Sequence, residues 1–213
     1  SELPLVDYPG NKHFYGLNTT VLGLVNERAS GETLENLVKN RITEPMNIKG
    51  LQYNRNSDTK LLPVFSGVDS VIRYANDGEL DIMGTYVPGY GLENELFMGG
   101  EGMIATADGY ADFLRMLLNH GELNGHRFLN ESSVKEIYSP HTQLENDYGY
   151  NGYNLWITSR LHKEKGYGDE GLWTGGGYEG THFWIDPKRD FVGLIMTQMF
   201  ETPKAGYGRD NDD

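Results

Sequence analysis

Three glycines near the C-terminal end of the chain have the spacing of a phosphate-binding loop. Gly175, Gly177 and Gly180 form the pattern G-x-G-x-x-G. In nucleotide-binding proteins this pattern lies between a strand and a helix, and the first NH groups of the helix hold a pyrophosphate. Here residues 181–185 are β-branched or aromatic and are followed by Asp186, which is typical of a strand. The glycines therefore lead into a strand, and we expect no phosphate loop.

The histidines lack the spacing of a metal site. None of them forms an H-E-x-x-H motif or another close pair. The chain has no cysteine, which excludes a thiolate nucleophile, a Cys-based zinc site and a disulfide framework. We expect solvated or packing roles for the histidines, and no metal or other cofactor. They are His13, His120, His126, His141, His162 and His182.

Composition limits the class of partner. The chain has 213 residues and a net charge of −13, from 31 acidic and 18 basic residues. Nucleic acids and anionic membranes bind basic patches, so neither is expected as a partner. No apolar run approaches the roughly 20 residues of a membrane span. The composition favours a soluble globular protein whose substrate is small and neutral or cationic.

Four helices are predicted from apolar spacing and from stop signals. Two lie at about 20–29 and 33–43, where Gly31 and Pro45 end them. A third follows Thr106, a good N-cap residue, and a short fourth helix begins near Asn130. The stripe expected to pack into the core after Thr106 consists of Tyr110, Phe113, Leu114, Leu117 and Leu118.

The remaining segments predict loops and then strands. Residues 47–100 are rich in Gly, Asn, Asp and Pro and favour loop, with one hairpin pairing 71–75 with 79–83. From Tyr153 onward the pattern changes to strands, in an antiparallel sheet. These strands are expected in the stretch YNLWITS, at 181–185 and at 191–198, the last two joined by the turn 186–190.

The fold class that follows is α+β. We expect a helical and loop region over 1–150, antiparallel strands over 151–200, and an acidic, disordered tail over 201–213. Neither terminus has the pattern of a natural end, so the chain is expected to be a fragment or a trimmed piece.

Three segments resemble one family in the correct order. The first contains Pro9-Gly10, Tyr15, Leu22-Gly23 and Pro45-Met46; the second is a glycine-rich loop and helix starting MGGEGMIATADGYADF; the third reads GYEGTHFWIDPKRDFVGLIMTQ. The chain thus resembles the serine β-lactamase-like hydrolases, the superfamily of class C β-lactamases, DD-peptidases (penicillin-binding proteins) and related esterases. The resemblance implies a partial β-lactamase/transpeptidase-like fold, a periplasmic or secreted location, and acyl transfer on a small ester, amide or β-lactam.

In this family a serine of a Ser-x-x-Lys helix attacks a carbonyl, a lysine and a tyrosine move its proton, and backbone NH groups hold the oxyanion. Tyr15 matches the motif tyrosine and is the candidate general base. The asparagine that the β-lactamase and peptidase branches carry two residues later is Leu17 here, and Asn18 is the substitute candidate for substrate binding. This departure weakens the β-lactam reading.

The third motif of the family, Lys/His/Trp-x-Gly, falls on Gly175, Gly176 and Gly177 when counted back from Asp186. These glycines are candidate substrate-binding residues because a missing side chain lets a substrate approach the backbone. The backbone NH of Tyr178 is the candidate oxyanion donor. A flexible turn is the alternative, and a slip of two residues would place the motif at 173–175 instead.

The family's Ser-x-x-Lys lies upstream of the motif tyrosine, and we expect it outside this sequence. Two letter matches occur inside: Ser57–Lys60 in a predicted loop and Ser132–Lys135 on a predicted surface helix, and neither has the context of a nucleophile. The resemblance therefore implies a serine hydrolase part that is inactive alone and associates with the missing N-terminal segment or with itself. The alternative is a non-catalytic binding or scaffold domain. The charged stretch 160–171 is either a loop at the cleft mouth or a solvated turn.

Overall fold

The computed structural model describes residues 7–8, 11, 16–67, 71–76, 96–142 and 149–200. Among these, no helix is both long and apolar enough to cross a bilayer. The helices are α1 (Asn18–Ser30), α2 (Leu34–Val38), a π-helical turn η1 (Lys39–Thr43), α3 (Ala107–Leu118), α4 (Glu131–Tyr138) and α5 (Arg160–Glu164).

The helix predictions are confirmed with two differences. Thr106 caps α3 by accepting the backbone NH of Gly109, and Gly31 ends α1 in the left-handed region at φ 73°. The second predicted helix continues from α2 as η1, where the NH of Glu44 donates to the carbonyl of Lys39 five residues earlier. The second difference is α5, a single turn inside the charged stretch that was predicted as loop.

The C-terminal strands form one antiparallel sheet, as predicted. Its order is β11-β10-β9-β8-β7, and every pair in it is antiparallel. The strands are β7 (Tyr150–Asn151), β8 (Trp156–Ile157), β9 (Trp173–Gly176), β10 (His182–Asp186) and β11 (Phe191–Ile195). The last strand is shorter than the predicted 191–198, because the chain leaves this sheet after Ile195 and enters another as β12 (Met199–Phe200).

Smaller sheets connect segments distant in sequence. β12 and β3 (Arg73–Tyr74) flank β2 (Phe65–Ser66), and β1 (Leu51–Gln52) pairs with β4 (Ile104–Ala105). The hairpin β5 (Glu122–Leu123) and β6 (His126–Arg127) follows α3. The hairpin predicted between 71–75 and 79–83 is not tested, because its second strand lies outside the described residues. The first strand contains β3, whose observed partner is β2.

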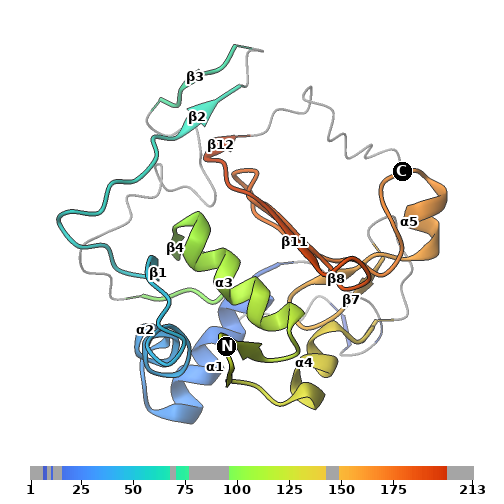
Figure 1. Cartoon of the computed structure of the whole chain (residues 1–213). Coiled ribbons are helices and arrows are strands. Elements are labelled where there is room, and N and C mark those ends of the chain that lie inside the picture. Colours follow the sequence, from blue (N-terminus) through green and yellow to red (C-terminus); the bar gives the residue numbers. More distant parts are fainter. Residues whose placement is uncertain are drawn as a thin grey trace.

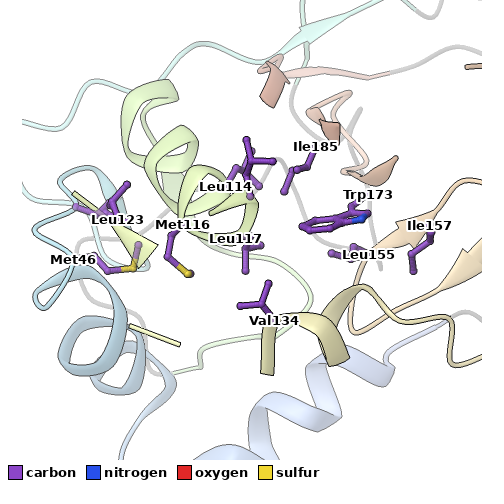
Figure 2. Packing of buried hydrophobic residues seen from close by; sticks show 12 residues of the cluster. Met46, Leu114, Met116, Leu117, Leu123, Val134, Leu155, Ile157, Trp173 and Ile185 are labelled. Atoms are coloured by element: carbon purple, nitrogen blue, oxygen red, sulfur yellow. The ribbon is translucent and has the colours of Figure 1, made fainter. Parts of the chain in front are cut away.

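The main apolar core lies between α3, α4 and one face of the sheet (Figure 1). Leu114 of α3, Val134 of α4 and Ile185 of β10 are all fully buried there, and Figure 2 shows them with Trp173 converging on the same space. The predicted stripe after Thr106 therefore does pack into the core. Because both the 1–150 and the 151–200 region contribute to this core, it spans the predicted domain boundary, and the division itself stays a prediction.

Candidate active site

The residues that follow the motif tyrosine lie at the start of α1. Tyr15 lies outside the described residues, so its facing position across a cleft stays a prediction. Leu17 is the exposed N-cap residue of α1 and Asn18, also exposed, is the first residue of the helix. The candidate Asn18 and the departure at Leu17 therefore lie on consecutive residues at one helix end. Their relation to the glycines of the third motif is not tested.

Two glycines position this helix end by a backbone contact. A β-carbon added at Gly99 would overlap the carbonyl oxygen of Thr19 and would lie 3.2 Å from the Cα of Gly23. A β-carbon at Gly23 would likewise lie 3.0 Å from the backbone nitrogen of Gly99. The glycine-rich loop thus packs directly against the first turns of α1. This gives a physical reason for the glycines in two of the quoted segments: only residues without a side chain allow so close an approach.

The glycines of the third motif belong partly to a strand. Gly175 and Gly176 lie in β9, where they face Phe183 and His182 of β10. A β-carbon at Gly175 would lie 2.7 Å from Cζ of Phe183, so the aromatic ring occupies the space of the absent side chain. The sequence predicted that this space would admit a substrate. In the structure, Gly175 makes room for Phe183, and its substrate-binding role remains a prediction.

Tyr178 lies in the turn between β9 and β10, whereas a strand was expected at this position. Gly177 donates its NH to the carbonyl of Thr181 at 2.7 Å and Gly180 donates to Gly177 at 3.1 Å, which closes the turn. Gly180 has φ 81°, a conformation that favours glycine. The prediction that these glycines lead into a strand and not into a helix is confirmed, because the chain continues from this turn directly into β10.

Residues after β11 brace the same turn from outside. The carbonyl of Glu179 accepts the NH of Met199 at 3.1 Å and the hydroxyl of Thr197 at 2.5 Å. The Thr181 hydroxyl donates to the carbonyl of Thr197 at 3.2 Å. These bonds hold the peptide between Glu179 and Gly180 through its carbonyl oxygen and tie Thr181 to the same segment. Sequence reasoning missed this brace, because it joins residues 16 to 20 positions apart and leaves no local pattern.

The alternative register of the third motif would start at Trp173. Its side chain is only 4% exposed and stacks on Tyr138 with ring centroids 4.1 Å apart. Trp173 faces the core together with Ile185, its partner on β10. A side chain held in this way does not reach a substrate from its observed position.

The two internal Ser-x-x-Lys matches have the surroundings that the sequence predicted. Ser57 lies in a turn and its hydroxyl donates to the Asp58 carboxylate at 3.3 Å, outside any helix. Ser132 and Lys135 lie on α4 and both are exposed. The first serine therefore lies in a turn beside a carboxylate, and the second lies with its lysine on the exposed face of a helix.

Titratable side chains near the sheet show perturbed pKa values with clear causes. Burial raises the pKa of Tyr110 to about 12, and burial together with the nearby Glu27 charge raises that of Tyr53 to about 12. A tyrosine base needs a lowered pKa, so neither suits that role. Burial lowers the pKa of His182, which lies opposite Gly176, and this favours the neutral imidazole. No group of three or more metal-ligating side chains occurs within the described ranges.

The charged stretch 160–171 is tied to the turn between β10 and β11. Arg189 donates to Asp186 and Asp169 at 2.5 and 2.7 Å, and Lys163 pairs with Asp169 at 3.4 Å. The hydrogen bond from Arg189 to Asp186 holds the pKa of Asp186 below its ordinary value. The hydrogen bonds from Arg189 and Lys163 to Asp169 hold the pKa of Asp169 below its ordinary value. The stretch is therefore linked to the sheet by ion pairs between exposed side chains, and its position at a cleft mouth stays a prediction.

The antiparallel sheet, the helices on one face and the glycine turn at the end of β9 together define part of a β-lactamase/transpeptidase-like fold. The comparisons agree: the Beta-lactamase family model matches residues 1–212, and the chain belongs to this family. It is similar to Protein Rv1367c of Mycobacterium tuberculosis, with 26% identity over 212 residues, covering 92% of this chain and 51% of that protein.

Solved structures share the fold at low identity. EstCE1, described as a hydrolase with promiscuous acyltransferase activity, matches with TM-score 0.76 and 18% identity over 93% of this chain and 54% of that one. Unliganded simvastatin synthase LovD from Aspergillus terreus matches with TM-score 0.74 and 21% identity, covering 95% and 53%. A penicillin-binding protein from Bacillus halodurans matches with TM-score 0.68 and 20% identity, covering 93% and 55%. The chain thus spans about half the length of these relatives and has a hydrolase/acyltransferase fold.

Proposed function

We propose that this chain forms the C-terminal part of a serine hydrolase that transfers acyl groups from small esters or amides. In this proposal Tyr15 is the general base, the NH of Tyr178 holds the oxyanion, and Asn18 with Gly176 and Gly177 contacts the substrate. The braced turn supports the proposal most strongly. The peptide that carries the Tyr178 NH is held through its carbonyl, because the carbonyl of Gly177 accepts the NH of Gly180 at 3.1 Å. An oxyanion donor is effective when it is oriented before the charge develops.

The glycine register of the third motif is preferred on packing grounds. Trp173 is buried against Tyr138, whereas Gly176 and Gly177 are exposed at the end of β9. A substrate can approach exposed backbone without displacing a core side chain.

We further propose that the nucleophilic serine comes from the corresponding N-terminal segment, and that this chain associates with that segment or with a second copy of itself. Two exposed apolar surfaces support association. Val21 and Val25 of α1 are more than half exposed, and so is Phe191 on β11, the last strand of its sheet among the described residues. The half-length match to the relatives supports the N-terminal segment as the partner.

The decisive experiment combines the chain with the N-terminal segment of its parent protein and measures ester turnover. Tyr15→Phe is expected to lower kcat by about 10² to 10⁴, the usual effect of losing a general base, without changing the circular dichroism spectrum. Unchanged turnover would return Tyr15 to a packing role.

The chain alone should take no label from a fluorophosphonate probe, and adding the N-terminal segment should restore labelling. Mass spectrometry identifies the labelled serine. A probe found on Ser57 or Ser132 of the lone chain would show that an internal Ser-x-x-Lys match is the nucleophile.

A non-catalytic binding or scaffold domain is the second candidate, and one observation favours it. The ring of Phe183 fills the space over Gly175, where the family carries a functional side chain. Absence of both turnover and labelling in the combined protein would support this candidate.

A further inference from the structure

Two threonine side chains link the turn between β9 and β10 to the segment that follows β11. The hydroxyl of Thr197 donates to the carbonyl of Glu179 at 2.5 Å, and the hydroxyl of Thr181 donates to the carbonyl of Thr197 at 3.2 Å. The backbone ladder between β10 and β11 ends at the pair His182 and Ile195. The two threonines therefore continue the connection between these segments through side chains, beyond the last backbone pair.

The turn that these hydroxyl groups hold is rich in glycine. Residues 175–177 and Gly180 have no side chain, and glycine has more backbone freedom than any other residue. The backbone hydrogen bonds from Gly177 to Thr181 and from Gly180 to Gly177 close the turn from within. Bonds inside one segment set its shape, but they do not fix its tip against the neighbouring chain. The threonine hydroxyl groups make that second connection.

The segment that carries Thr197 is anchored on its other side. The NH of Phe65 in β2 donates to the carbonyl of Gln198 at 2.7 Å, and Met199 lies opposite Phe65 in the parallel pair of β12 and β2. The ring of Phe65 stacks on Tyr74 of β3, with centroids 5.1 Å apart. A second sheet therefore holds the backbone from which Thr197 reaches the turn. Threonine is also β-branched, which restricts χ1 and limits the directions of the hydroxyl group.

We infer that Thr197 and Thr181 are positioning residues of the proposed acyl transfer, because their hydroxyl groups hold the turn that carries the NH of Tyr178. The inference rests on the proposed function, in which this NH holds the oxyanion. A backbone donor stabilises a developing charge when it is oriented beforehand, and a glycine-rich turn supplies little of that order by itself. Neither threonine touches the substrate in this role, since each acts through the turn.

The test compares Thr197→Val with Thr197→Ser in the full chain combined with the N-terminal segment of its parent protein, with p-nitrophenyl acetate as the ester. Valine keeps the branched shape and removes the hydroxyl group, whereas serine keeps the hydroxyl group. Loss of an oxyanion donor costs roughly 10² to 10³ in kcat, so a donor that is present but less well oriented should cost about tenfold. Thr197→Val should lower kcat by this factor with KM nearly unchanged, because the contact forms in the transition state. Thr197→Ser should keep most of kcat.

Thr33→Val is the matched control. The Thr33 hydroxyl accepts the NH of Asn36 at 3.2 Å and caps α2, so this variant also loses a threonine hydrogen bond. It should lower the melting temperature and leave kcat unchanged. Amide hydrogen exchange on the 213-residue chain gives a readout that does not depend on activity. The NH groups of Gly177 and Gly180 should exchange faster in Thr197→Val, but not in Thr197→Ser or Thr33→Val.

Failure of this inference is distinguishable from failure of the proposed function. If the combined protein turns over ester and Thr197→Val has an unchanged kcat, the inference is overturned and the proposed function stands. An equal fall of kcat in Thr33→Val, or in Thr197→Ser, overturns it as well, because the hydroxyl group at the turn would then not be responsible. If the unaltered combined protein shows neither turnover nor labelling, the proposed function fails and the positioning role fails with it, whatever the exchange rates in the turn.

Discussion

Replacing Gly99 by alanine should destabilise the protein through a single backbone contact. The added methyl would overlap the carbonyl oxygen of Thr19 and lie 3.1 Å from its carbonyl carbon. Because the obstacle is helix backbone, relief requires a shift of α1 or of the loop. The backbone at Gly99 is not in the left-handed region, so the cost comes from overlap alone.

The magnitude follows from two opposing effects. Overpacking of this kind costs typically about 1–3 kcal/mol, and overlap with backbone places the site near the upper end. Alanine restricts the unfolded chain more than glycine does, which offsets about 0.4–1 kcal/mol. The net loss should be about 2 kcal/mol, or roughly 4–8 °C in Tm for a chain of this size.

Thermal unfolding followed by circular dichroism measures this loss, with Gly67→Ala as the control. A β-carbon at Gly67 meets nothing within 4 Å, so this variant should be as stable as the unaltered chain or slightly more stable. Gly23→Ala adds a check from the other side of the contact. Its overlap with Gly99 is partly offset by about 1 kcal/mol of helix propensity. Equal melting of Gly99→Ala and Gly67→Ala would refute the contact.

Two further predictions concern the core and the ion pairs. Leu114→Ala should lower the free energy of unfolding by about 2–5 kcal/mol, because the side chain is fully buried, whereas Leu62→Ala at an exposed site should change it by less than about 0.5 kcal/mol in urea titrations. Arg189→Gln should flatten the dependence of Tm on pH below about 4, the ordinary aspartate range. The folded-state pKa of Asp186 is depressed chiefly by Arg189, so the stabilisation is present above the unfolded pKa and is lost as pH falls through the folded pKa. An unchanged acid slope in the variant would contradict this assignment.

Local sequence patterns predicted much of the fold. Thr106 and the apolar stripe after it were sufficient for α3, because a capping hydroxyl and a 3.6-residue period act within one helix. The β-branched and aromatic run at 181–185, the apolar run from 191 and the turn at 186–190 were sufficient for the antiparallel pair β10 and β11. Gly31 correctly marked the end of α1.

The same patterns did not predict which surfaces are buried. The apolar spacing in 20–29 correctly predicted a helix, yet Val21, Leu22 and Val25 are exposed in the structure and only Gly23 is buried. Apolar periodicity predicts that a helix has an apolar face, but it does not predict which segment packs against that face. This information lies in the partner, which is distant in sequence or belongs to another polypeptide.

For the candidate site, the sequence by itself determined the family segments and the glycine cluster, because these depend on residue identity and order, and it predicted Tyr15 as the motif tyrosine. Only the tertiary structure decided that Phe183 fills the space over Gly175 and that Met199 braces Glu179. Cross-strand packing and hydrogen bonds join residues far apart in the chain, so register and neighbours emerge only when the strands are assembled.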